Sequence, residues 1–334
     1  MKTKRSEAAT TMTCSAVRLL ALCLTLSLCA AFAAPARTSQ KTKTSPAAKT
    51  TKATASSAST RTLAISTQPD AVVWVDEVRR GTSDAGGKLS LAVSPGRHSL
   101  RVRAQGFGER TLAILPAQRG AIEVRLVATK DQAELLFQQA EEAREKGGGD
   151  EGRRNAAELY RQALKLRPRF PAAHVGLARV LLASEDNDGA LDEIAAARRV
   201  RPAYAEASAV EGRILRSLAE QDAAVAAYRR AIREGGGFQP EAYTGMGIVL
   251  EEKGDYEGAV AAFRKAVAQL SDSEPALYQL MGAAYEKLER WKEAVAAYEK
   301  YLELAPEGGQ SSAIRSIIDQ LRQQAADQQQ SPPE

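Results

Sequence analysis

A nine-residue pattern recurs along the chain at a nearly constant interval. Three close copies, "AVAAYRRAI", "AVAAFRKAV" and "AVAAYEKYL", begin at Ala224, Ala259 and Ala294, and two weaker copies begin at Ala156 and Ala190. Successive copies therefore start 34, 34, 35 and 35 residues apart. Self-similarity at a fixed period of this size is the signature of a repeat architecture, in which each unit packs mainly against its neighbours. The second half of the chain is accordingly predicted to be a solenoid.

Each copy has the apolar spacing of a helix. In "AVAAFRKAV", Ala259, Phe263 and Ala266 recur at i, i+4 and i+7, which places them on one face. The other stripes are Ala156, Tyr160, Ala163; Ala190, Ile194, Ala197; Ala224, Tyr228, Ala231; and Ala294, Tyr298, Tyr301. A residue that ends or weakens a helix follows each stripe, at Pro168, Pro202, Gly236, Ser271 and Pro306.

Another helix precedes each stripe and carries a small residue at a fixed place. Twelve residues before the alanines of the last four stripes stand Ala178, Gly212, Gly247 and Gly282. A glycine within a helix costs about 1 kcal/mol relative to alanine, so it needs a packing reason. We predict that Phe263 lies against Gly247, because only a small residue lets the two helices approach closely. Two departures are visible: "GGGDEG" lengthens the first turn, and Glu211 occupies a usually apolar position.

This two-helix period, with its small residue, aromatic residue and terminal proline in order, resembles the tetratricopeptide repeat. The best match is the fourth repeat, with Tyr243, Gly247, Leu250, Gly254, Tyr256, Ala259, Phe263 and Ala266. The resemblance implies an all-α solenoid of five repeats over residues 131–306. An amphipathic segment, 307–325, is predicted to cap it, and 326–334 is expected to be a disordered tail.

A different texture precedes the solenoid, over residues 62–128. Leu89, Leu91 and Val93 alternate with polar residues, which indicates half-buried strands of a small all-β sandwich. The segments "QPDAVVWVDE" and "SPGRHSLRVRAQGF" resemble the PEGA domain, a β-sandwich of bacterial envelope and surface proteins; a carboxypeptidase regulatory-like sandwich also fits. Either resemblance implies an exported module without chemistry of its own. Trp74 is expected in the core, with a sugar-binding platform as the alternative.

The first residues are typical of an export signal. Basic residues precede the apolar run "LLALCLTLSLCAAFA", which ends in small residues near Ala33, so residues 1–33 are predicted to be a cleaved signal peptide. An uncleaved anchor and a lipoprotein are the weaker alternatives. Residues 34–61 are predicted to be a disordered basic linker, with contact to envelope polymers as a less favoured role. We therefore expect a periplasmic or envelope-associated protein. All 3 cysteines fall within the signal, so the mature chain would lack thiols.

Charge and motifs argue against several function classes. Residues 129–334 carry 27 Lys and Arg against 34 Asp and Glu, which does not suit nucleic-acid binding. The 2 histidines, His98 and His174, lie in different predicted domains, and His174 is expected to be a packing residue. "SEDNDG", which begins at Ser184, lacks the closing glutamate of a calcium loop and reads as a turn. No enzyme motif is present, and no cofactor or metal is expected.

The remaining candidate is the concave surface that the resemblance implies. The position after each small residue should face it, as should the position one turn further on. On this basis the candidate groove residues are Arg179, Arg213, Arg216, Glu251, Glu252 and Glu286. Two interpretations are open: local pairing of the charges, or a bipolar groove in which the three arginines cluster without acidic neighbours and bind an acidic segment.

The sequence therefore predicts a non-catalytic scaffold or adaptor of the bacterial cell envelope that binds a protein or peptide in this groove. Two rival hypotheses are retained. In one, the sandwich and linker attach to glycan or peptidoglycan. In the other, the chain is an accessory subunit of an envelope enzyme complex. The identity of the partner and the oligomeric state are left open.

Overall fold

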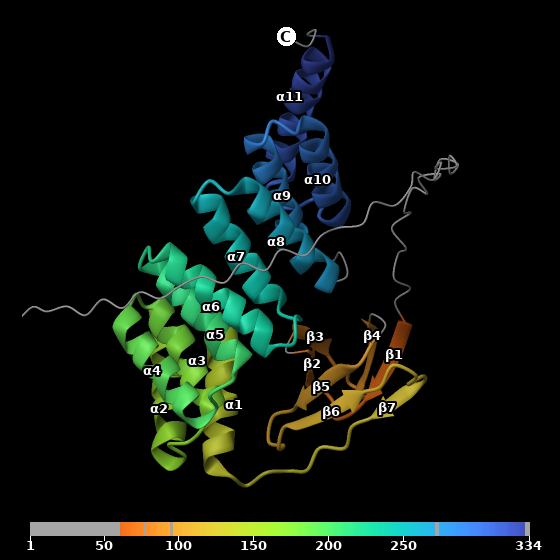
Figure 1. Cartoon of the computed structure of the whole chain (residues 1–334). Coiled ribbons are helices and arrows are strands. Elements are labelled where there is room, and N and C mark those ends of the chain that lie inside the picture. The colour runs from red at the N-terminus through yellow and green to blue at the C-terminus, as the bar shows by residue number, and fades with distance from the viewer. Residues whose placement is uncertain (1–60, 77, 94–95, 271–273, 331–334) are drawn as a thin grey trace, which may run out of the picture. The chain divides into compact units, whose positions relative to one another are not determined.

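The computed structural model describes residues 61–76, 78–93, 96–270 and 274–330, all within one compact unit, Ser56–Glu334. The predicted signal peptide, almost all of the predicted linker and the Ser271 helix end lie outside the described residues. A β region comes first and is followed by a long helical region (Figure 1). Its strands are β1 (Arg61–Ser66), β2 (Val72–Val75), β3 (Val78–Thr82), β4 (Lys88–Val93), β5 (His98–Arg103), β6 (Arg110–Ile114) and β7 (Ala121–Glu123).

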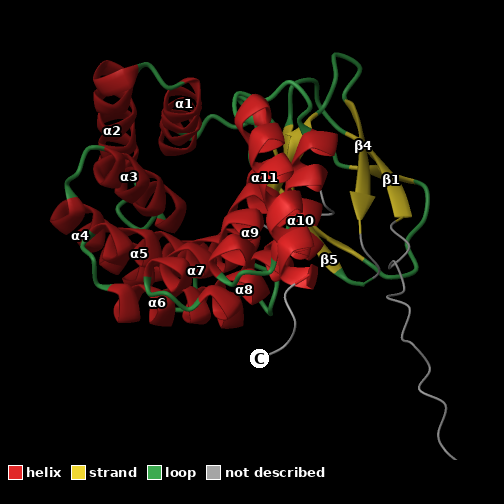
Figure 2. Cartoon of the chain, turned by 90° about the horizontal axis from the view of Figure 1, so that it is seen from above, coloured by secondary structure: helices red, strands yellow, loops and turns green. Residues whose placement is uncertain are grey.

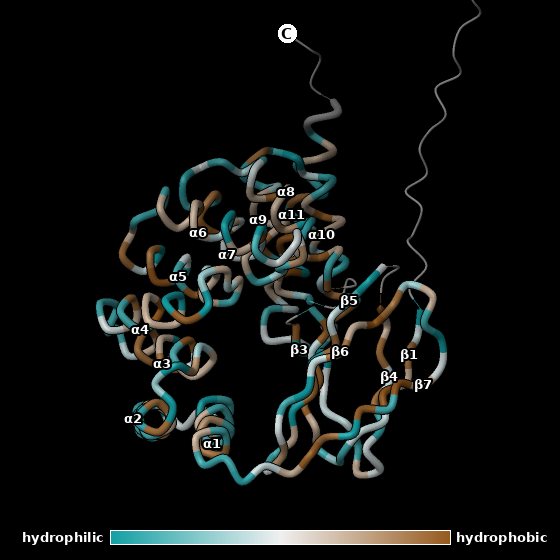
Figure 3. The backbone as a smooth tube through the Cα atoms, turned by 60° about the horizontal axis from the view of Figure 1, so that its bottom comes forward, coloured by the Kyte–Doolittle hydropathy of each residue, from teal (hydrophilic) through white to brown (hydrophobic). Residues whose placement is uncertain are grey.

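The strands form two sheets, one with the order β4-β1-β7 and the other with the order β3-β2-β5-β6. All pairs are antiparallel except β1 with β7. Alternate residues of the two sheets point inward and share one core, as the period of two predicts; Leu63, Leu91, Val73 and Leu100 belong to it. Apolar and polar stretches alternate along these strands (Figure 3).

Trp74 is buried, but it lies outside the core of the sandwich. Its neighbours Val73 and Val75 point into that core, so the strand alternation directs Trp74 to the opposite face. There the guanidinium of Arg101 lies 4.4 Å from the centre of a Trp74 ring, and that of Arg103 lies 5.1 Å away. The expectation that Trp74 is a core residue is thus correct for its burial and wrong for its location.

Eleven helices follow within the described residues, and the first ten form five antiparallel pairs. The helices are α1 (Gln132–Lys146), α2 (Gly149–Leu166), α3 (Pro171–Ala183), α4 (Asn187–Val200), α5 (Ala205–Ser217), α6 (Gln221–Glu234), α7 (Pro240–Glu252), α8 (Tyr256–Gln269), α9 (Pro275–Lys287), α10 (Trp291–Leu304) and α11 (Ser311–Gln330). We number the pairs as repeats one to five. The odd-numbered helices α1 to α9 contact one another in succession and lie on the inner side of a curved row (Figure 2).

The apolar stripes that the sequence predicted are buried in every repeat. The glycine argument is also confirmed: a Cβ atom added to Gly247 would lie 2.5 Å from the Phe263 ring. The same relation holds between Gly212 and Tyr228, at 2.7 Å. A second contact was not anticipated. Gly245, on the first helix of the next repeat, also lies against Tyr228, where a Cβ would come closer still to the ring. The aromatic residue therefore packs against two first helices.

The helix ends follow elementary capping rules. Proline opens α3, α7 and α9, and the side chains of Asp186 and Asp255 cap α4 and α8. Asp186 shows that "SEDNDG" is the predicted inter-helix turn. One residue of this turn has a positive φ in four repeats, namely Glu185, Ala219, Gly254 and Glu289.

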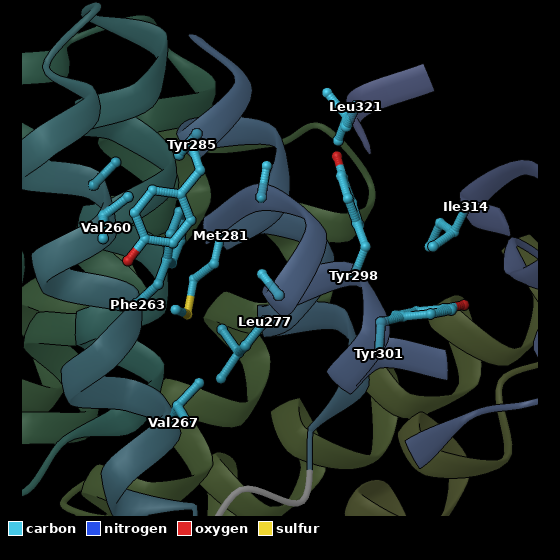
Figure 4. Close-up of a cluster of buried hydrophobic side chains, with 14 of the residues drawn as sticks. Val260, Phe263, Val267, Leu277, Met281, Tyr285, Tyr298, Tyr301, Ile314 and Leu321 are labelled. Atoms are coloured by element: carbon cyan, nitrogen blue, oxygen red, sulfur yellow. The ribbon is translucent and has the colours of Figure 1, made fainter. Parts of the chain in front are cut away.

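The end of the solenoid is covered by α11. Ile314, Ile318 and Leu321 of this helix are buried in a cluster with Tyr298 and Tyr301 of α10 (Figure 4). The helix extends to Gln330, five residues beyond the end that we expected for the cap. Burial of this last apolar face is what a terminal cap provides in repeat proteins.

Glu211 does not disturb its repeat, because the structure supplies polar partners. Arg230 of α6 donates a hydrogen bond to Glu211 and a second one to the hydroxyl of Ser208. Ser208 in turn donates to Glu234 at 2.6 Å. A partly buried polar cluster thus replaces the apolar contact that the repeat pattern leads one to expect.

His174 is a packing residue whose ring is also fully bonded. Its Nδ1 lies 2.5 Å from Glu193 Oε2, and its Nε2 lies 2.9 Å from the Pro168 carbonyl oxygen. Because both neighbours are acceptors, the geometry requires a proton on each ring nitrogen. Burial disfavours the charged ring, but the bonds to Glu193 and Pro168 outweigh it and raise the pKa of His174 above 6.5.

The free energy of unfolding should therefore depend on this ring. A raised pKa in the folded state contributes stability that is fully present below pH 6.5 and is lost as the pH rises through the folded pKa. Replacing His174 by glutamine should flatten this loss, which denaturant unfolding between pH 6 and pH 9 can measure. Parallel pH profiles for the two proteins would contradict the assignment.

The sandwich and α1 are joined by several side chains. Gln138 of α1 accepts a hydrogen bond from Gly106 N–H at 2.9 Å and donates one to the Phe107 carbonyl at 2.7 Å. Arg103 lies over both Trp74 and the Phe137 ring, with its guanidinium 4.6 Å from the latter. Gln138 and Arg103, which make these contacts, are polar, so the hydrophobic pattern of the sequence does not indicate them.

Candidate functional site

The inner side of the helical row carries a cavity of about 600 Å³. Residues of α1, α3, α5, α7 and α9 line it, together with the outer face of the β3-β2-β5-β6 sheet. Its lining changes in character along the solenoid. Arginine and glutamate dominate at α3 and α5, whereas Ile248, Leu277 and Leu280 give an apolar surface at α7 and α9. We call this cavity the groove.

The structure places half of the predicted site residues in the groove. Arg179, Arg213 and Arg216 line it, but Glu251, Glu252 and Glu286 are not among its lining residues. Glu252 is paired with Arg216, and Glu286 accepts a hydrogen bond from the Tyr298 hydroxyl.

Glu251 remains a surface residue with a perturbed carboxyl. Partial burial and the adjacent Glu252 raise its pKa above the ordinary 4.5. The predicted bipolar groove, with arginines at one end and free carboxylates at the other, is therefore not what the side chains form.

The three arginines do not lack acidic neighbours, which corrects the bipolar interpretation. Arg179 is bound to Glu206 at 2.6 Å and to Glu241 at 3.3 Å. Arg213 lies 3.5 Å from Glu241, and Arg216 lies 2.6 Å from Glu252. Each carboxylate belongs to a later repeat than its arginine. The local-pairing interpretation is the correct one, and we call this arrangement the ion-pair ladder.

The ladder is strongest at Arg179 and Glu206. Their side chains are 19% and 21% exposed, so the attraction between them is little screened. Burial alone would raise the pKa of the Glu206 carboxyl, but Arg179 and other cations outweigh burial and hold it at about 2. By the same balance, Glu206 and Glu241 raise the pKa of Arg179 above its ordinary value.

The ion pair of Arg213 is the weakest of the ladder. This side chain is 50% exposed, and its ion pair with Glu241 is too long for a hydrogen bond. A guanidinium has five N–H donors, so Arg213 keeps donors available for a bound molecule. The Nε and Nη2 groups of Arg216 are both bound to one oxygen of Glu252, at 2.8 and 2.6 Å.

A tyrosine hydroxyl reaches the inner side of the solenoid in three repeats. In repeat one the Tyr160 hydroxyl donates to Glu141, and in repeat five the Tyr298 hydroxyl donates to Glu286. Tyr228 of repeat three lines the groove and is 1% exposed. Burial raises its pKa to about 12, so the hydroxyl keeps its proton and is a donor.

Sequence reasoning missed Glu206, Glu241 and the Tyr228 hydroxyl. The two glutamates lie in the first turns of α5 and α7, away from the helix positions from which the groove was predicted. One signal was available: Glu206 and Glu241 are one repeat apart, as are Arg179 and Arg213.

The comparisons with known proteins address the helical region. Two family models described as tetratricopeptide repeat match residues 153–214 and 238–307. The chain contains tetratricopeptide repeats. This confirms the sequence prediction for the repeats; no family model identifies the β region, so its PEGA-like character stays a prediction. No curated protein matches the chain.

Three solved structures are similar to part of this chain. The pilF protein of Pseudomonas aeruginosa is 18% identical over 59% of this chain and 88% of that one, with a TM-score of 0.50. A thermophilic TPR protein of Thermus thermophilus is 21% identical over 57% of this chain and 98% of that one, with a TM-score of 0.47. A MamA protein is 23% identical over 54% of this chain and 94% of that one, with a TM-score of 0.42.

Among the described residues, no three or more His, Cys, Asp or Glu side chains are grouped as a metal site requires. Of the helices in the described part, none combines the length and hydropathy needed to cross a membrane.

Proposed function

We propose that this protein is a non-catalytic scaffold of the bacterial cell envelope that binds a protein or peptide partner in the groove. Proteins built from tetratricopeptide repeats are generally protein–protein interaction scaffolds. The observation that carries the proposal is the groove itself, whose apolar surface at α7 and α9 adjoins the charged surface at α3 and α5. Such a surface can anchor apolar side chains of a partner while polar groups fix its register.

The envelope location is the part of the proposal that rests on the sequence. The predicted signal peptide and the PEGA-like segments both favour export. We propose that the mature chain is periplasmic or envelope-associated, with the basic linker between the export signal and the sandwich.

Attachment to glycan through the sandwich is less favoured. A sugar platform needs an exposed aromatic face, whereas Trp74 is 9% exposed and has Arg101 and Arg103 stacked against it. The experiment below therefore includes a measurement of glycan binding. An accessory subunit of an envelope enzyme complex would be a scaffold whose partner is that enzyme, so the same experiment addresses it.

The groove can be tested with a double substitution on its apolar surface. Ile248→Glu with Leu280→Glu should lower recovery of the periplasmic partner at least about tenfold, because a truncated or charged anchor typically costs more than 1 kcal/mol of binding. The measurement is quantitative co-purification from periplasm, together with a thermal melt of each variant.

The matched control places the same charges elsewhere on the solenoid. Leu166 and Leu218 are exposed, and neither lines the groove. Leu166→Glu with Leu218→Glu should retain the partner. Equal recovery with both double variants would refute groove binding, and co-sedimentation of both with purified sacculi would favour the glycan hypothesis.

A further inference from the structure

The groove contains a hydroxyl donor that the fold leaves without a partner. Among the residues that the structure describes, the Tyr228 hydroxyl makes no hydrogen bond, although the side chain is 1% exposed. A Cβ added to Gly245 would lie 2.5 Å from the hydroxyl oxygen, so the ring runs along the bare backbone of α7. Both residues line the groove. The hydroxyl oxygen is not fully enclosed, so it opens to the groove, where an acceptor of a bound molecule can reach it.

Two other repeats show which group accepts the hydrogen bond of the equivalent tyrosine hydroxyl. The Tyr160 and Tyr298 hydroxyls each donate to a glutamate of the first helix in their own repeat, Glu141 and Glu286. Glu141 directly follows Ala140, which takes the place of the small residue in repeat one, and Glu286 lies one turn beyond the corresponding place in repeat five. In both cases the acceptor is a carboxylate.

Repeat three has arginine at both of these places. Arg213 directly follows Gly212, and Arg216 lies one turn further on. Both guanidiniums act electrostatically on Tyr228, as do the carboxylates of Glu241 and Glu252. The intramolecular carboxylate is thus absent from the two places that supply it elsewhere, and two cations stand there. Arg213, half-exposed and only loosely paired with Glu241, keeps donors for a bound anion.

We infer that Tyr228, Arg213 and Arg216 form a subsite for a glutamate side chain of the bound partner. This inference rests on the proposed function and adds the chemistry of one contact. The partner's carboxylate accepts the Tyr228 hydroxyl proton in a hydrogen bond, as Glu141 and Glu286 do for their tyrosines. Arg213 supplies charge-assisted bonds to the same carboxylate. Glu252 and Glu241 keep the site close to neutral when it is empty.

The test uses a defined peptide with the full chain. The probe is Ac-Ala-Leu-Glu-Leu-Ala-NH2, and its isosteric control has glutamine in place of glutamate. Binding is followed by NMR of tyrosine labelled at Cζ, in which the Tyr228 signal is identified by its loss in Tyr228→Phe. The glutamate peptide should shift this signal saturably and bind about tenfold more tightly than the glutamine peptide, since a hydrogen bond to a charged group contributes about 1.5–3 kcal/mol.

Two variants test the donors. Tyr228→Phe should reduce the preference for glutamate about fivefold or more without altering the thermal melt, because Phe263 already occupies the equivalent place in repeat four. Tyr298→Phe is the matched control. The hydroxyl that it deletes already donates its hydrogen bond to Glu286, so peptide affinity should not change. Arg213→Gln should also reduce the preference, whereas the exposed Arg199→Gln and Arg229→Gln on second helices should not.

Three outcomes would overturn the inference. These are equal affinity for the two peptides, an unchanged preference in Tyr228→Phe, and no saturable shift at millimolar peptide, which would leave the hydroxyl bonded to water only. A third peptide, Ac-Ala-Leu-Gln-Leu-Ala-OH, separates a terminal carboxylate from a side chain. If only this one binds, the glutamate assignment is wrong. Loss of the natural partner in the Ile248 and Leu280 variant, with retention in Tyr228→Phe, would reject the subsite and keep the proposed function.

Discussion

Replacing Gly247 by leucine should lower the free energy of unfolding by about 1–3 kcal/mol, the usual effect of overpacking a well-filled core. The Cβ atom alone would stand 2.5 Å from the ring of Phe263, which is fully buried. α7 and α8 would have to separate, and their contacts with α9 would change with them. Chemical denaturation followed by circular dichroism measures the loss.

The control for this prediction is Gly254→Leu, in the turn between the same two helices. A Cβ at Gly254 would meet nothing within 4 Å, but the residue has a φ of +80°. The cost there is backbone strain, and Ala219 and Glu289 accept the same conformation in their own repeats. We therefore expect about 1 kcal/mol. A Gly247 variant no less stable than the Gly254 variant would contradict the close approach of α7 and α8.

Replacing Glu206 by glutamine should remove an acid-dependent part of the stability. The pKa of Glu206 is about 2 in the folded protein, below its ordinary 4.5. The folded carboxyl therefore stays ionised at a pH where the unfolded one binds a proton. The contribution is present above pH 4.5 and is lost as the pH falls toward 2. A difference of this size corresponds to about 3 kcal/mol.

The measurement is the free energy of unfolding of both proteins between pH 7 and pH 3. The wild type should lose more stability than Glu206→Gln over this range, so that the two curves converge at low pH. Glu257→Gln is a suitable control, since this carboxylate lies in the first turn of α8 and outside the groove. If the difference in the free energy of unfolding between wild type and Glu206→Gln does not change with pH, the substitution acts through lost packing. That result would exclude the ion pair as the source of the difference.

The sequence predicted the helices because the same physical requirement recurs in each repeat. The buried stripe, the helix-ending residue and the glycine opposite the aromatic residue each had several copies, so Gly247 could be matched to Phe263 before the structure was known. The extent of α11 was underestimated because "AADQQQ" contains neither proline nor glycine to end the helix before residue 331. The face of Trp74 was predictable in principle, since Val73 and Val75 on either side occupy the core.

The site was less accessible to sequence reasoning, for a geometric reason. Candidate residues were chosen by their offset within one repeat, and this placed Arg179, Arg213 and Arg216 at the groove. Their partners lie on later repeats: Glu206 is 27 residues and Glu241 is 62 residues beyond Arg179. Which side chains meet across repeats depends on the rotation between successive units, which no single repeat encodes. That the Tyr228 hydroxyl lacks an acceptor among the described residues could be recognised only from the contacts of repeats one, three and five.

The reach of Arg179 has a consequence for how the solenoid opens. Energetic descriptions of repeat proteins treat each unit as coupled only to its immediate neighbours. Here one guanidinium binds repeat three through Glu206 and repeat four through Glu241, so repeats two to four share a connection that skips a unit. These three repeats should then lose amide protection together, as one cooperative block, while α10 and α11 can fray without them. The part of the chain that holds the groove would thus open and close as a single segment.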